Sequence, residues 1–334
     1  MRILILGGGG REHALFTKIS RSDMVSELYI APGNGGCPSA QRLNLDINDF
    51  DAIYNVIIDK MIHMIVVGPE IPLAGGIKDY FQKKIPELMV FGPDQRSAML
   101  EASKVFSYRF MAKAGIPTAK SSVAENFQEA EIILKNHPMP VVIKADGLAA
   151  GKGVSIHHGA AEALERCREI FEDRIFGDSG SQILFQQFLT GKEASLFAVC
   201  NGREAVYLPT ACDYKRVFDN GEGPNTGGMG SFCPGNILTP EHIARAHREI
   251  VQKVIDEFQY TGVLYTGLMI NGDDLSVIEF NCRLGDPETQ SVMPMIETDL
   301  VPYLVWACGG DEVPYRIQRE GYMTLPTKPG YTLN

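Results

Sequence analysis

One stretch constrains this chain more than any other, a glycine-rich loop that follows a short apolar run. The apolar run is Pro140–Ile143, and the loop that follows it reads Lys144-Ala-Asp-Gly-Leu-Ala-Ala-Gly-Lys-Gly-Val154. Glycines let backbone N–H groups converge on an anion without obstruction by Cβ atoms, and lysines add positive charge. The residues concerned are Gly147, Gly151, Gly153, Lys144 and Lys152. The pattern predicts a buried strand that ends in a polyphosphate-binding loop; the alternative is a glycine-rich turn beside solvated lysines.

This loop does not fit the P-loop pattern. That pattern, G-x-x-x-x-G-K-[ST], has a longer spacing between its glycines and a hydroxyl-bearing residue after its lysine. Here Gly151 follows Gly147 too closely, and Gly153 follows Lys152. We therefore expect a phosphate-binding loop of another kind.

Composition limits the classes of ligand. The chain has 334 residues, a hydrophobic fraction of 45%, a charged fraction of 22% and a net charge of −10, which is typical of a soluble protein of about two domains. The negative charge disfavours nucleic acid and anionic membranes, so lysines, arginines and backbone amides must hold any anionic ligand locally. Seven cysteines without a CxxC pair argue against a zinc site and a disulfide framework. We expect a cytoplasmic protein.

The first 96 residues alternate between apolar runs and helical segments. A glycine- or proline-bearing turn follows each run, a pattern that predicts a parallel sheet with crossover helices, hence an α/β, Rossmann-like domain. The runs are Ile3–Leu6, Glu27–Ile30, Met64–Val67 and Leu88–Phe91. The turns therefore fall at the carboxyl ends of strands, where open α/β sheets bind ligands.

A dinucleotide fingerprint fails in the first of these turns. With Gly7 and Gly9 as its first two glycines, the third position is Glu12, and the second strand ends at Pro32 without an acidic residue for a ribose. A helix that begins near Arg11 still offers free N–H groups and a favourable dipole to an anion. The prediction is a phosphorylated small molecule, not NAD.

Residues 97 to 310 predict a two-lobed region of α+β type. Ser97 is expected to cap one helix from Ala98 to about Ala114, which Gly115 ends. A small lobe follows over about 118 to 190, with strands at 120–123, up to Lys144 and at 183–188, and with helices at 127–136 and 160–172. Further strands are expected at 194–200, 205–208, 263–270 and 275–280, and a helix capped at Thr239 is expected to run to about Phe258.

Two later segments carry charge in patterns that suit a bound phosphate. Asp213–Pro234 is long, glycine-rich and without periodicity, which favours a binding loop. Glu279 and Asn281 stand two apart in a predicted strand and so present oxygens to one point, as a hard cation such as Mg²⁺ requires. Arg283 follows and suits a transferring phosphoryl group. The alternative is an acidic edge strand with an unrelated surface arginine.

Together these motifs resemble the phosphoribosylamine–glycine ligase (glycinamide ribonucleotide synthetase) family of the ATP-grasp superfamily. The resemblance runs from residue 1 to about 310. The matching segments are Gly9–Leu15, Ala31–Asn34, Val67–Glu70, Lys144–Val154, Gly223–Gly230 and Ile278–Gln290. It implies a Rossmann-like domain followed by a two-lobed ATP-grasp. The implied reaction uses ATP to phosphorylate the carboxylate of glycine, which the amine of 5-phosphoribosylamine then attacks to give glycinamide ribonucleotide, ADP and phosphate.

The resemblance also implies a role for each matching residue. ATP would be bound by Lys104, Lys144, Gly147, Gly151, Lys152, Gly153, Phe188, Leu189 and Glu193. Mg²⁺ or Mn²⁺ would be bound by Glu279 and Asn281. Phosphoribosylamine would be surrounded by Gly9, Gly10, Arg11, Asn34, Glu70, Asp213, Asn225, Thr226, Gly227 and Gly228. The catalytic side chains would be Arg283, Asp286 and Lys215.

The sequence departs from the family at four places. Gln186 and Gln187 replace acidic residues on the adenine side, Tyr214 replaces a histidine, and Leu284 replaces a phenylalanine. The family continues into a further α/β domain, whereas residues 311–334 form only a proline-bearing tail, so we expect that domain to be absent.

Two other functions stay open: ligation of another amine or amino acid, and nucleotide binding without turnover. We expect a monomer or weak dimer.

Overall fold

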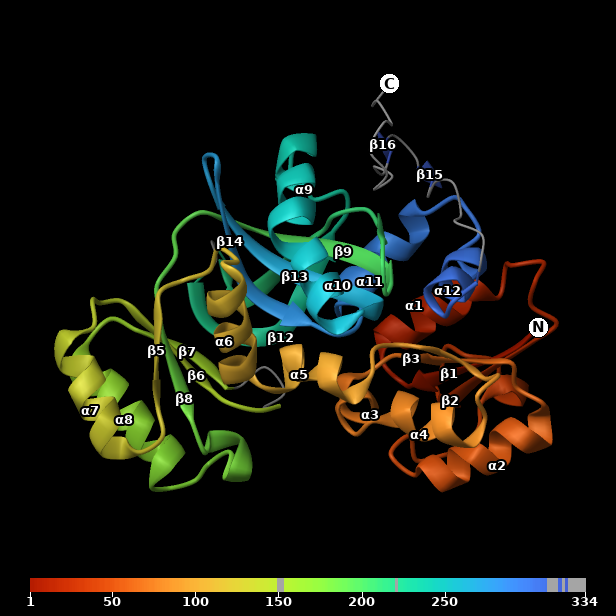
Figure 1. Cartoon of the computed structure of the whole chain (residues 1–334), viewed down its shortest axis with the longest axis horizontal. Coiled ribbons are helices and arrows are strands. Elements are labelled where there is room, and N and C mark those ends of the chain that lie inside the picture. The colour runs from red at the N-terminus through yellow and green to blue at the C-terminus, as the bar shows by residue number, and fades with distance from the viewer. Residues whose placement is uncertain (149–152, 220–221, 311–317, 320–321, 324–334) are drawn as a thin grey trace.

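The computed structural model describes residues 1–148, 153–219, 222–310, 318–319 and 322–323 (Figure 1). Three sheets organise this part of the chain. The N-terminal sheet lies at the right of Figure 1, the sheet of the small lobe lies at the left, and the largest antiparallel sheet, the core sheet, lies between them. The class is α/β, as the sequence predicts.

The N-terminal sheet is parallel, as the alternating runs indicate. Its strands are β1 (Arg2–Gly7), β2 (Glu27–Pro32), β3 (Met64–Val67) and β4 (Met89–Phe91), in the order β2-β1-β3-β4. Its helices are α1 (Gly10–Ile19), α2 (Phe50–Lys60), α3 (Glu70–Ala74) and α4 (Ile77–Lys84), with a 3₁₀ turn at Ser39–Gln41. Alternate residues of β1 enter two cores, since Ile3 packs with α1 and Leu4 packs with α2 and α4. The sheet is therefore covered on both faces.

The small lobe is an antiparallel sheet with two helices packed against it. The strands are β5 (Ser121–Ala124), β6 (Val141–Ala145), β7 (Val154–His157) and β8 (Ile183–Gln187), in the order β5-β8-β6-β7. The helices are α7 (Phe127–Asn136) and α8 (Ala160–Phe171), with a 3₁₀ turn at Gly177–Gly180. Strand β7 is absent from the sequence prediction. Because β7 pairs with β6, the glycine-rich loop connects two antiparallel strands, whereas a P-loop connects a strand to a helix.

The core sheet has the strand order β10-β9-β13-β14. Its strands are β9 (Lys192–Asn201), β10 (Ala205–Tyr207), β13 (Thr261–Asn271) and β14 (Asp274–Asn281). The helical segment that packs on it is α9 (Pro240–Ala246), a π-helical turn (His247–Val251) and α10 (Gln252–Phe258). Thr239 caps this segment through the N–H of His242, as predicted. The segment after β14 forms α11 (Glu288–Val292), a 3₁₀ turn (Met293–Met295) and α12 (Val301–Ala307); the short strands β15 (Gln318–Arg319) and β16 (Tyr322–Met323) follow.

The single helix predicted over 98–114 is wrong, because the structure has two helices there. Helix α5 (Gln95–Ala102) is capped by Asp94, and α6 (Lys104–Ala114) begins after Ser103. The Ser103 hydroxyl donates to Asp146 at 3.0 Å and accepts the N–H of Phe106, while Asp146 also accepts the N–H of Val105 at 3.0 Å. A contact from a distant loop therefore supports a break that local propensity does not reveal. Gly115 ends α6 in the left-handed conformation, as expected.

The prediction that 213–234 form an irregular loop is also wrong. This segment forms a two-stranded antiparallel ribbon of β11 (Cys212–Phe218) and β12 (Glu222–Phe232). The register shifts twice along the ribbon, and β12 is glycine-rich, so the sequence lacks the period-two alternation that would predict strands.

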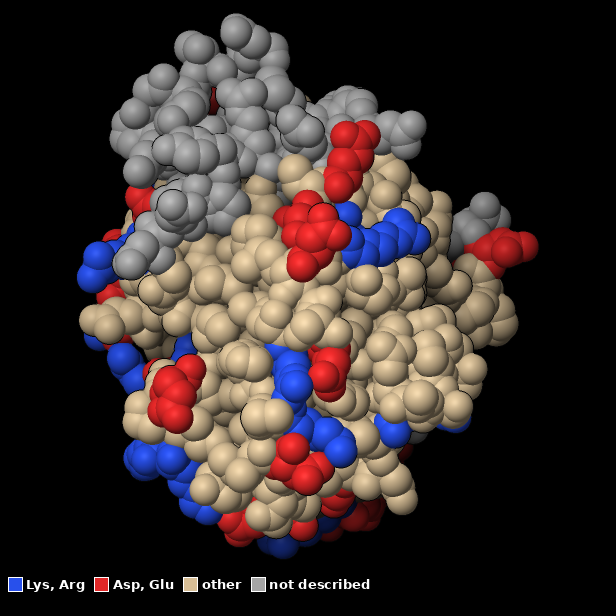
Figure 2. All heavy atoms as spheres, turned by 90° about the vertical axis from the view of Figure 1, so that its right-hand side faces the viewer, with Lys and Arg blue, Asp and Glu red and all other residues tan. Residues whose placement is uncertain are grey.

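The described residues contain no helix that is both long and apolar enough to cross a membrane. On the face that Figure 2 shows, acidic and basic side chains are mixed among mostly neutral ones. The described part of that face therefore presents no continuous basic surface to a polyanion.

Candidate active site

A cleft of about 1240 Å³ is lined by residues of the small lobe, the core sheet, the ribbon and the N-terminal region. Its volume slightly exceeds the usual range for a small-molecule pocket, as binding of more than one ligand would require. Most of the predicted site residues line it. They are Arg11, Glu70, Lys104, Lys144, Gly153, Phe188, Leu189, Glu193, Asp213, Lys215, Thr226, Gly227, Glu279, Asn281, Arg283 and Asp286.

The remaining predicted residues lie beside the cleft or outside the description. The amide of Asn34 donates to the carbonyl oxygens of Gly8 and Gly9, both at 3.2 Å, so it holds the turn after β1. Gly10 abuts the side chain of Gln290, and Gly228 abuts Pro287. The carbonyl oxygen of Gly147 accepts a hydrogen bond from Lys104 Nζ. Gly151, Lys152 and the side chain of Asn225 lie outside the described residues.

Two lysines enter the cleft from different elements. Lys144 stands on β6 and donates from Nζ to the carbonyl oxygen of Ile278 on β14 at 2.9 Å. Lys104 is the first residue of α6, and its Nζ donates to the carbonyl oxygen of Gly147 at 2.8 Å. Burial lowers the pKa of Lys144 to about 8. Lys144 is thus a cation held almost without water, which makes it a strong partner for an anion.

Glu279 and Asn281, two residues apart on β14, line the same cleft. Burial raises the pKa of Glu279, but the charges of Lys215 and Lys144 outweigh burial and hold that pKa below its ordinary value. An ionised carboxylate beside an amide suits a hard cation. Among the described residues no group of three or more His, Cys, Asp or Glu side chains could hold a metal. A cation at Glu279 and Asn281 would therefore need further oxygens from a ligand or water.

Apolar side chains from both sheets also line the cleft, which suits a flat aromatic ligand such as a nucleobase. They are Val142, Ile156 and Leu184 in the small lobe and Met269 and Val277 in the core sheet.

Both of the glutamines that depart from the family pattern line this cleft as well. Gln186 is buried, and its Nε2 donates to the hydroxyl of Ser121 at 3.1 Å; Gln187 is exposed at the end of β8.

The ribbon contributes an acid–base pair to the cleft. Lys215 Nζ lies 3.3 Å from an oxygen of Glu193 and 3.8 Å from an oxygen of Asp213. Burial raises the pKa of Asp213 to about 6, although Lys215 opposes this shift. Glu288, which sequence reasoning missed, is buried nearby and accepts from the hydroxyl of Ser195 at 3.2 Å. This wall of the cleft changes charge just below neutral pH.

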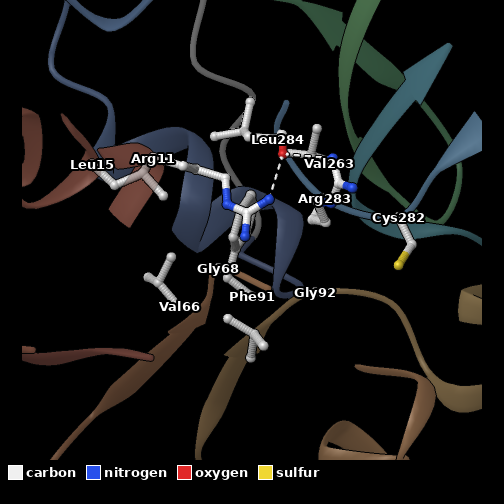
Figure 3. Close-up of a pocket in the computed structure, with 11 residues that line it drawn as sticks. Arg11, Leu15, Val66, Gly68, Phe91, Gly92, Val263, Cys282, Arg283 and Leu284 are labelled. Carbon is white, nitrogen blue, oxygen red and sulfur yellow. Dashed lines mark hydrogen bonds between the residues drawn. The ribbon is translucent and has the colours of Figure 1, made fainter. Parts of the chain in front are cut away.

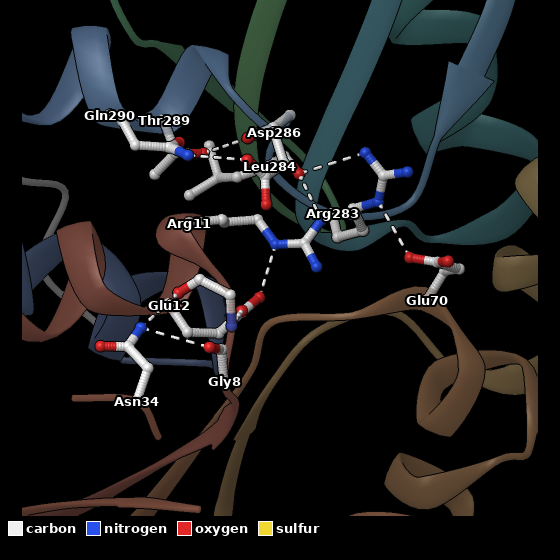
Figure 4. Close-up of polar contacts among 12 residues, drawn as sticks. Gly8, Arg11, Glu12, Asn34, Glu70, Arg283, Leu284, Asp286, Thr289 and Gln290 are labelled. Carbon is white, nitrogen blue, oxygen red and sulfur yellow. Dashed lines mark hydrogen bonds and ion pairs between the residues drawn. The ribbon is translucent and has the colours of Figure 1, made fainter. Parts of the chain in front are cut away.

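Arg283 occupies the junction of the N-terminal region with the core sheet (Figure 4). Its Nε lies 3.3 Å from Glu70, its Nη1 donates to the carbonyl oxygen of Leu284 at 3.2 Å, and its Nη2 donates to Glu101 at 2.6 Å. Glu101 is a second residue that sequence reasoning missed, because a lone glutamate on a helix carries no signal. Arg11 donates to the same carbonyl of Leu284 at 3.1 Å.

The cavity beside these two arginines is small (Figure 3). It has a volume of about 10 Å³ and lies among Arg11, Phe91, Val263 and Leu284. Such a volume holds about one water molecule, so the ligand space of this region is the large cleft.

Glu12 explains why the dinucleotide fingerprint fails. Its carboxylate is buried and accepts the N–H of Gly9 at 2.7 Å and the Nε of Arg11 at 2.6 Å. A Cβ atom on Gly7 would lie 2.4 Å from the Glu12 side chain, and one on Gly68 would lie 2.2 Å from it. Gly7 and Gly68 therefore leave room for the Glu12 carboxylate beneath the turn. In a dinucleotide-binding protein, a third glycine stands at the position of Glu12.

Comparison with known proteins agrees with this geometry. Residues 1–101 match the family model for the N domain of phosphoribosylglycinamide synthetase, and residues 102–289 match the model for its ATP-grasp (A) domain. Among curated relatives, phosphoribosylamine–glycine ligase of Ralstonia nicotianae is 44% identical over 317 residues, covering 93% of this chain and 75% of the relative. The ligase of Chlorobaculum tepidum is 41% identical over 337 residues, covering 97% and 79%.

Comparison with solved structures leads to the same family. The crystal structure of phosphoribosylamine–glycine ligase from Thermotoga maritima superposes with a TM-score of 0.79 at 34% identity, covering 96% of this chain and 78% of that one. D-alanine–D-alanine ligase from Bacillus anthracis superposes with a TM-score of 0.65 at 16% identity, covering 92% and 97%, which is a likeness of fold alone. The chain thus spans about three quarters of the length of its curated relatives.

Proposed function

Because this chain belongs to the phosphoribosylglycinamide synthetase family of ATP-grasp ligases, we propose that its cleft is the site that joins glycine to 5-phosphoribosylamine. The family activity is an ATP-dependent carboxylate–amine ligation in purine biosynthesis. One observation carries the assignment to this cleft: Lys144 of the small lobe and the Glu279–Asn281 pair of the core sheet line the same space.

ATP would lie between the small lobe and the core sheet. Its base would fit among the apolar side chains of the two sheets, with Phe188, Leu189 and Glu193 at the rim. Its phosphates would meet Lys104 and Lys144, whose Nζ atoms donate to the carbonyl oxygens of Gly147 beside the cleft and of Ile278 in its lining. Placing two cations in a site with little water strengthens their attraction for a polyphosphate.

Glu279 and Asn281 would hold Mg²⁺ or Mn²⁺ together with phosphate oxygens. When bound, the cation neutralises charge on the phosphates and orients them for transfer. The residues fit this task because Glu279 stays ionised and because an amide oxygen stands two residues away on the same strand.

Glycine and phosphoribosylamine would occupy the end of the cleft near the N-terminal region. The turn Gly9–Arg11, with Asn34 behind it, offers the N-terminus of α1 to the phosphate. Glu70 and Asp213 supply carboxylates for hydroxyl or amine groups, and the ribbon residues Asn225 to Gly228 complete this end.

The chain need not supply a nucleophile, since the amine of the substrate attacks the acyl phosphate. What the side chains must do is hold the two substrates in contact, stabilise the charge of the transferring group and exclude water. Arg283, Asp286 and Lys215 would do this for the phosphoryl group and for glycine.

We further propose that residues 1–96 form a Rossmann-like domain that precedes the ATP-grasp and contributes to the phosphoribosylamine site. Residues 97–310 would then form the ATP-grasp, with about 118–190 as its lid lobe. We also propose a cytoplasmic enzyme that is a monomer or weak dimer.

One assay tests the function. ADP release is measured with ATP, Mg²⁺, glycine and freshly generated phosphoribosylamine, and each component is omitted in turn. Release that requires both glycine and phosphoribosylamine supports the proposal. Release with a different amine or amino acid would identify another ligase of the same chemistry, and tight ATP binding without release would identify a nucleotide-binding protein.

A further inference from the structure

Glu101, on helix α5, accepts hydrogen bonds from two consecutive residues, Cys282 and Arg283, in the turn that follows β14. One of its oxygens accepts from Arg283 Nη2 at 2.6 Å, and the other accepts from the backbone N–H of Cys282 at 2.8 Å and from the Cys282 thiol at 3.1 Å. The Glu101 side chain is only 7% exposed. One buried carboxylate therefore fixes both the main chain after Asn281 and the guanidinium that follows.

A second carboxylate, Glu70, binds the same guanidinium more loosely. Its oxygen lies 3.3 Å from Arg283 Nε, and its side chain is 25% exposed. Glu101 and Glu70 both line the cleft. An anion that enters the cleft can compete more readily with Glu70 than with Glu101, because the contact of Glu101 with the guanidinium is shorter and its side chain is more buried. In the described residues, the hydrogen bonds of Arg283 use one N–H on each of Nε, Nη1 and Nη2. The second N–H on Nη1 and on Nη2 thus stays available to a ligand.

From these contacts we propose that Glu101 is a positioning residue for Arg283. Its carboxylate holds the guanidinium and the turn after β14 in the orientation in which Arg283 meets the transferring phosphoryl group. Glu101 touches none of the reacting atoms and acts through Arg283. The inference rests on the proposed function for its catalytic consequence, but the contact itself can be tested separately.

Glu101→Gln is the informative variant, because an amide has one oxygen where the carboxylate has two. If that oxygen accepts from Cys282, an NH₂ group faces the guanidinium, and if it accepts from Arg283, an NH₂ group faces the backbone N–H. Glu257→Gln is the matched control. Glu257 binds Arg96 of the same helix α5 at 2.7 Å, but that pair is exposed and remote from the cleft lining.

Steady-state kinetics test the catalytic role. Glu101→Gln is expected to lower kcat roughly 10- to 100-fold and to leave the KM for ATP nearly unchanged, because a misplaced group costs rate more than nucleotide binding. In an Arg283→Ala background the same substitution should lower kcat by less than about twofold, since its effect passes through the absent guanidinium. An equal loss in both backgrounds, or no loss in either, overturns the proposal. If Glu101→Gln fails to fold, Glu101→Asp replaces it, with an intermediate loss of kcat expected.

Hydrogen exchange of the Arg283 Nη2–H groups, one of which donates to Glu101, is followed by NMR of arginine side chains and tests the contact without turnover. We expect exchange to be at least about tenfold faster in Glu101→Gln than in the wild type, since the guanidinium loses its fixed partner, and to be unchanged in Glu257→Gln. Unchanged exchange in Glu101→Gln contradicts the proposal. Should the wild type release no ADP with glycine and phosphoribosylamine, the proposed function fails, and this measurement still decides the role of Glu101.

Discussion

The ammonium of Lys144 donates a 2.9 Å hydrogen bond to the carbonyl oxygen of Ile278, the residue immediately before Glu279. This bond crosses from the small lobe to the core sheet and places the lysine and the carboxylate on one cleft. The two charges support each other, since Lys144 lowers the pKa of Glu279 and Glu279 opposes the fall in the pKa of Lys144. A triphosphate with its cation would fit between such a pair.

The protonation of Lys144 should control nucleotide affinity. Burial lowers its pKa to about 8, so the free enzyme carries a neutral amine above that pH and a cation below it. Bound phosphates favour the cation, so nucleotide binding at pH 8.5 should take up a proton, and affinity for ADP should weaken between pH 7 and 9.5.

Isothermal titration calorimetry in two buffers of different ionisation enthalpy measures this proton uptake. Lys144→Met should abolish the uptake and weaken binding by about 10- to 100-fold, the value of a charged hydrogen bond. Proton uptake that persists in the variant would assign it to another group.

Glu279→Gln should remove metal-dependent turnover. The substitution keeps the shape of the side chain but removes the charge that binds the cation, so kcat is expected to fall by more than about 100-fold. Titration of Mg²⁺ against turnover is the measurement. Asp274→Asn, on the exposed start of β14, is the control and should behave as the wild type. Unchanged turnover in Glu279→Gln contradicts the metal assignment.

Asp213 should trade stability for activity. Burial raises the pKa of Asp213 to about 6, compared with about 3.9 in the unfolded chain. Below about pH 3.9 the carboxyl group is protonated in both states and costs no stability. Above about pH 6 it is ionised in both states, and the folded protein bears the full cost of burying that charge. Asp213→Asn should therefore raise the free energy of unfolding by about 1–3 kcal/mol at pH 7.5 and by less at pH 4.5.

Urea unfolding at the two pH values measures the gain, and turnover from pH 5 to 8 measures the cost. The acid limb of the wild-type profile near pH 6 should be missing from the variant, which should also be less active. A gain in stability that is the same at both pH values would show that ionisation of Asp213 is not its cause.

Gly68→Ala should displace Glu12. A Cβ atom there would lie 2.2 Å from a Glu12 oxygen in a buried site, and overpacking of this kind costs about 1–3 kcal/mol. The KM for phosphoribosylamine should rise as well, because Glu12 holds the N–H of Gly9 in the turn before α1. Gly35→Ala is the control, since a Cβ atom there meets nothing within 4 Å. Equal behaviour of the two variants in thermal unfolding and kinetics would contradict the role given to Glu12.

Local pattern was sufficient for much of the fold. The four apolar runs predict the parallel sheet because its strands are buried on both faces. The spacing of Glu279 and Asn281 predicts a shared face because side chains alternate along a strand. Likewise, the glycines after Lys144 predict a loop for an anion, although the sequence did not reveal that strand β7 follows this segment.

Only the tertiary structure decided the contacts between distant segments. Ser103 breaks the predicted helix because Asp146 reaches it from the small lobe, and Glu101 meets Arg283 across 182 positions of the chain. The ribbon of β11 and β12 is likewise held by pairing between strands that carry no alternating pattern. A residue sequence specifies propensity and periodicity over a few neighbours, but a buried carboxylate receives its partner only when the complete chain brings that partner to it.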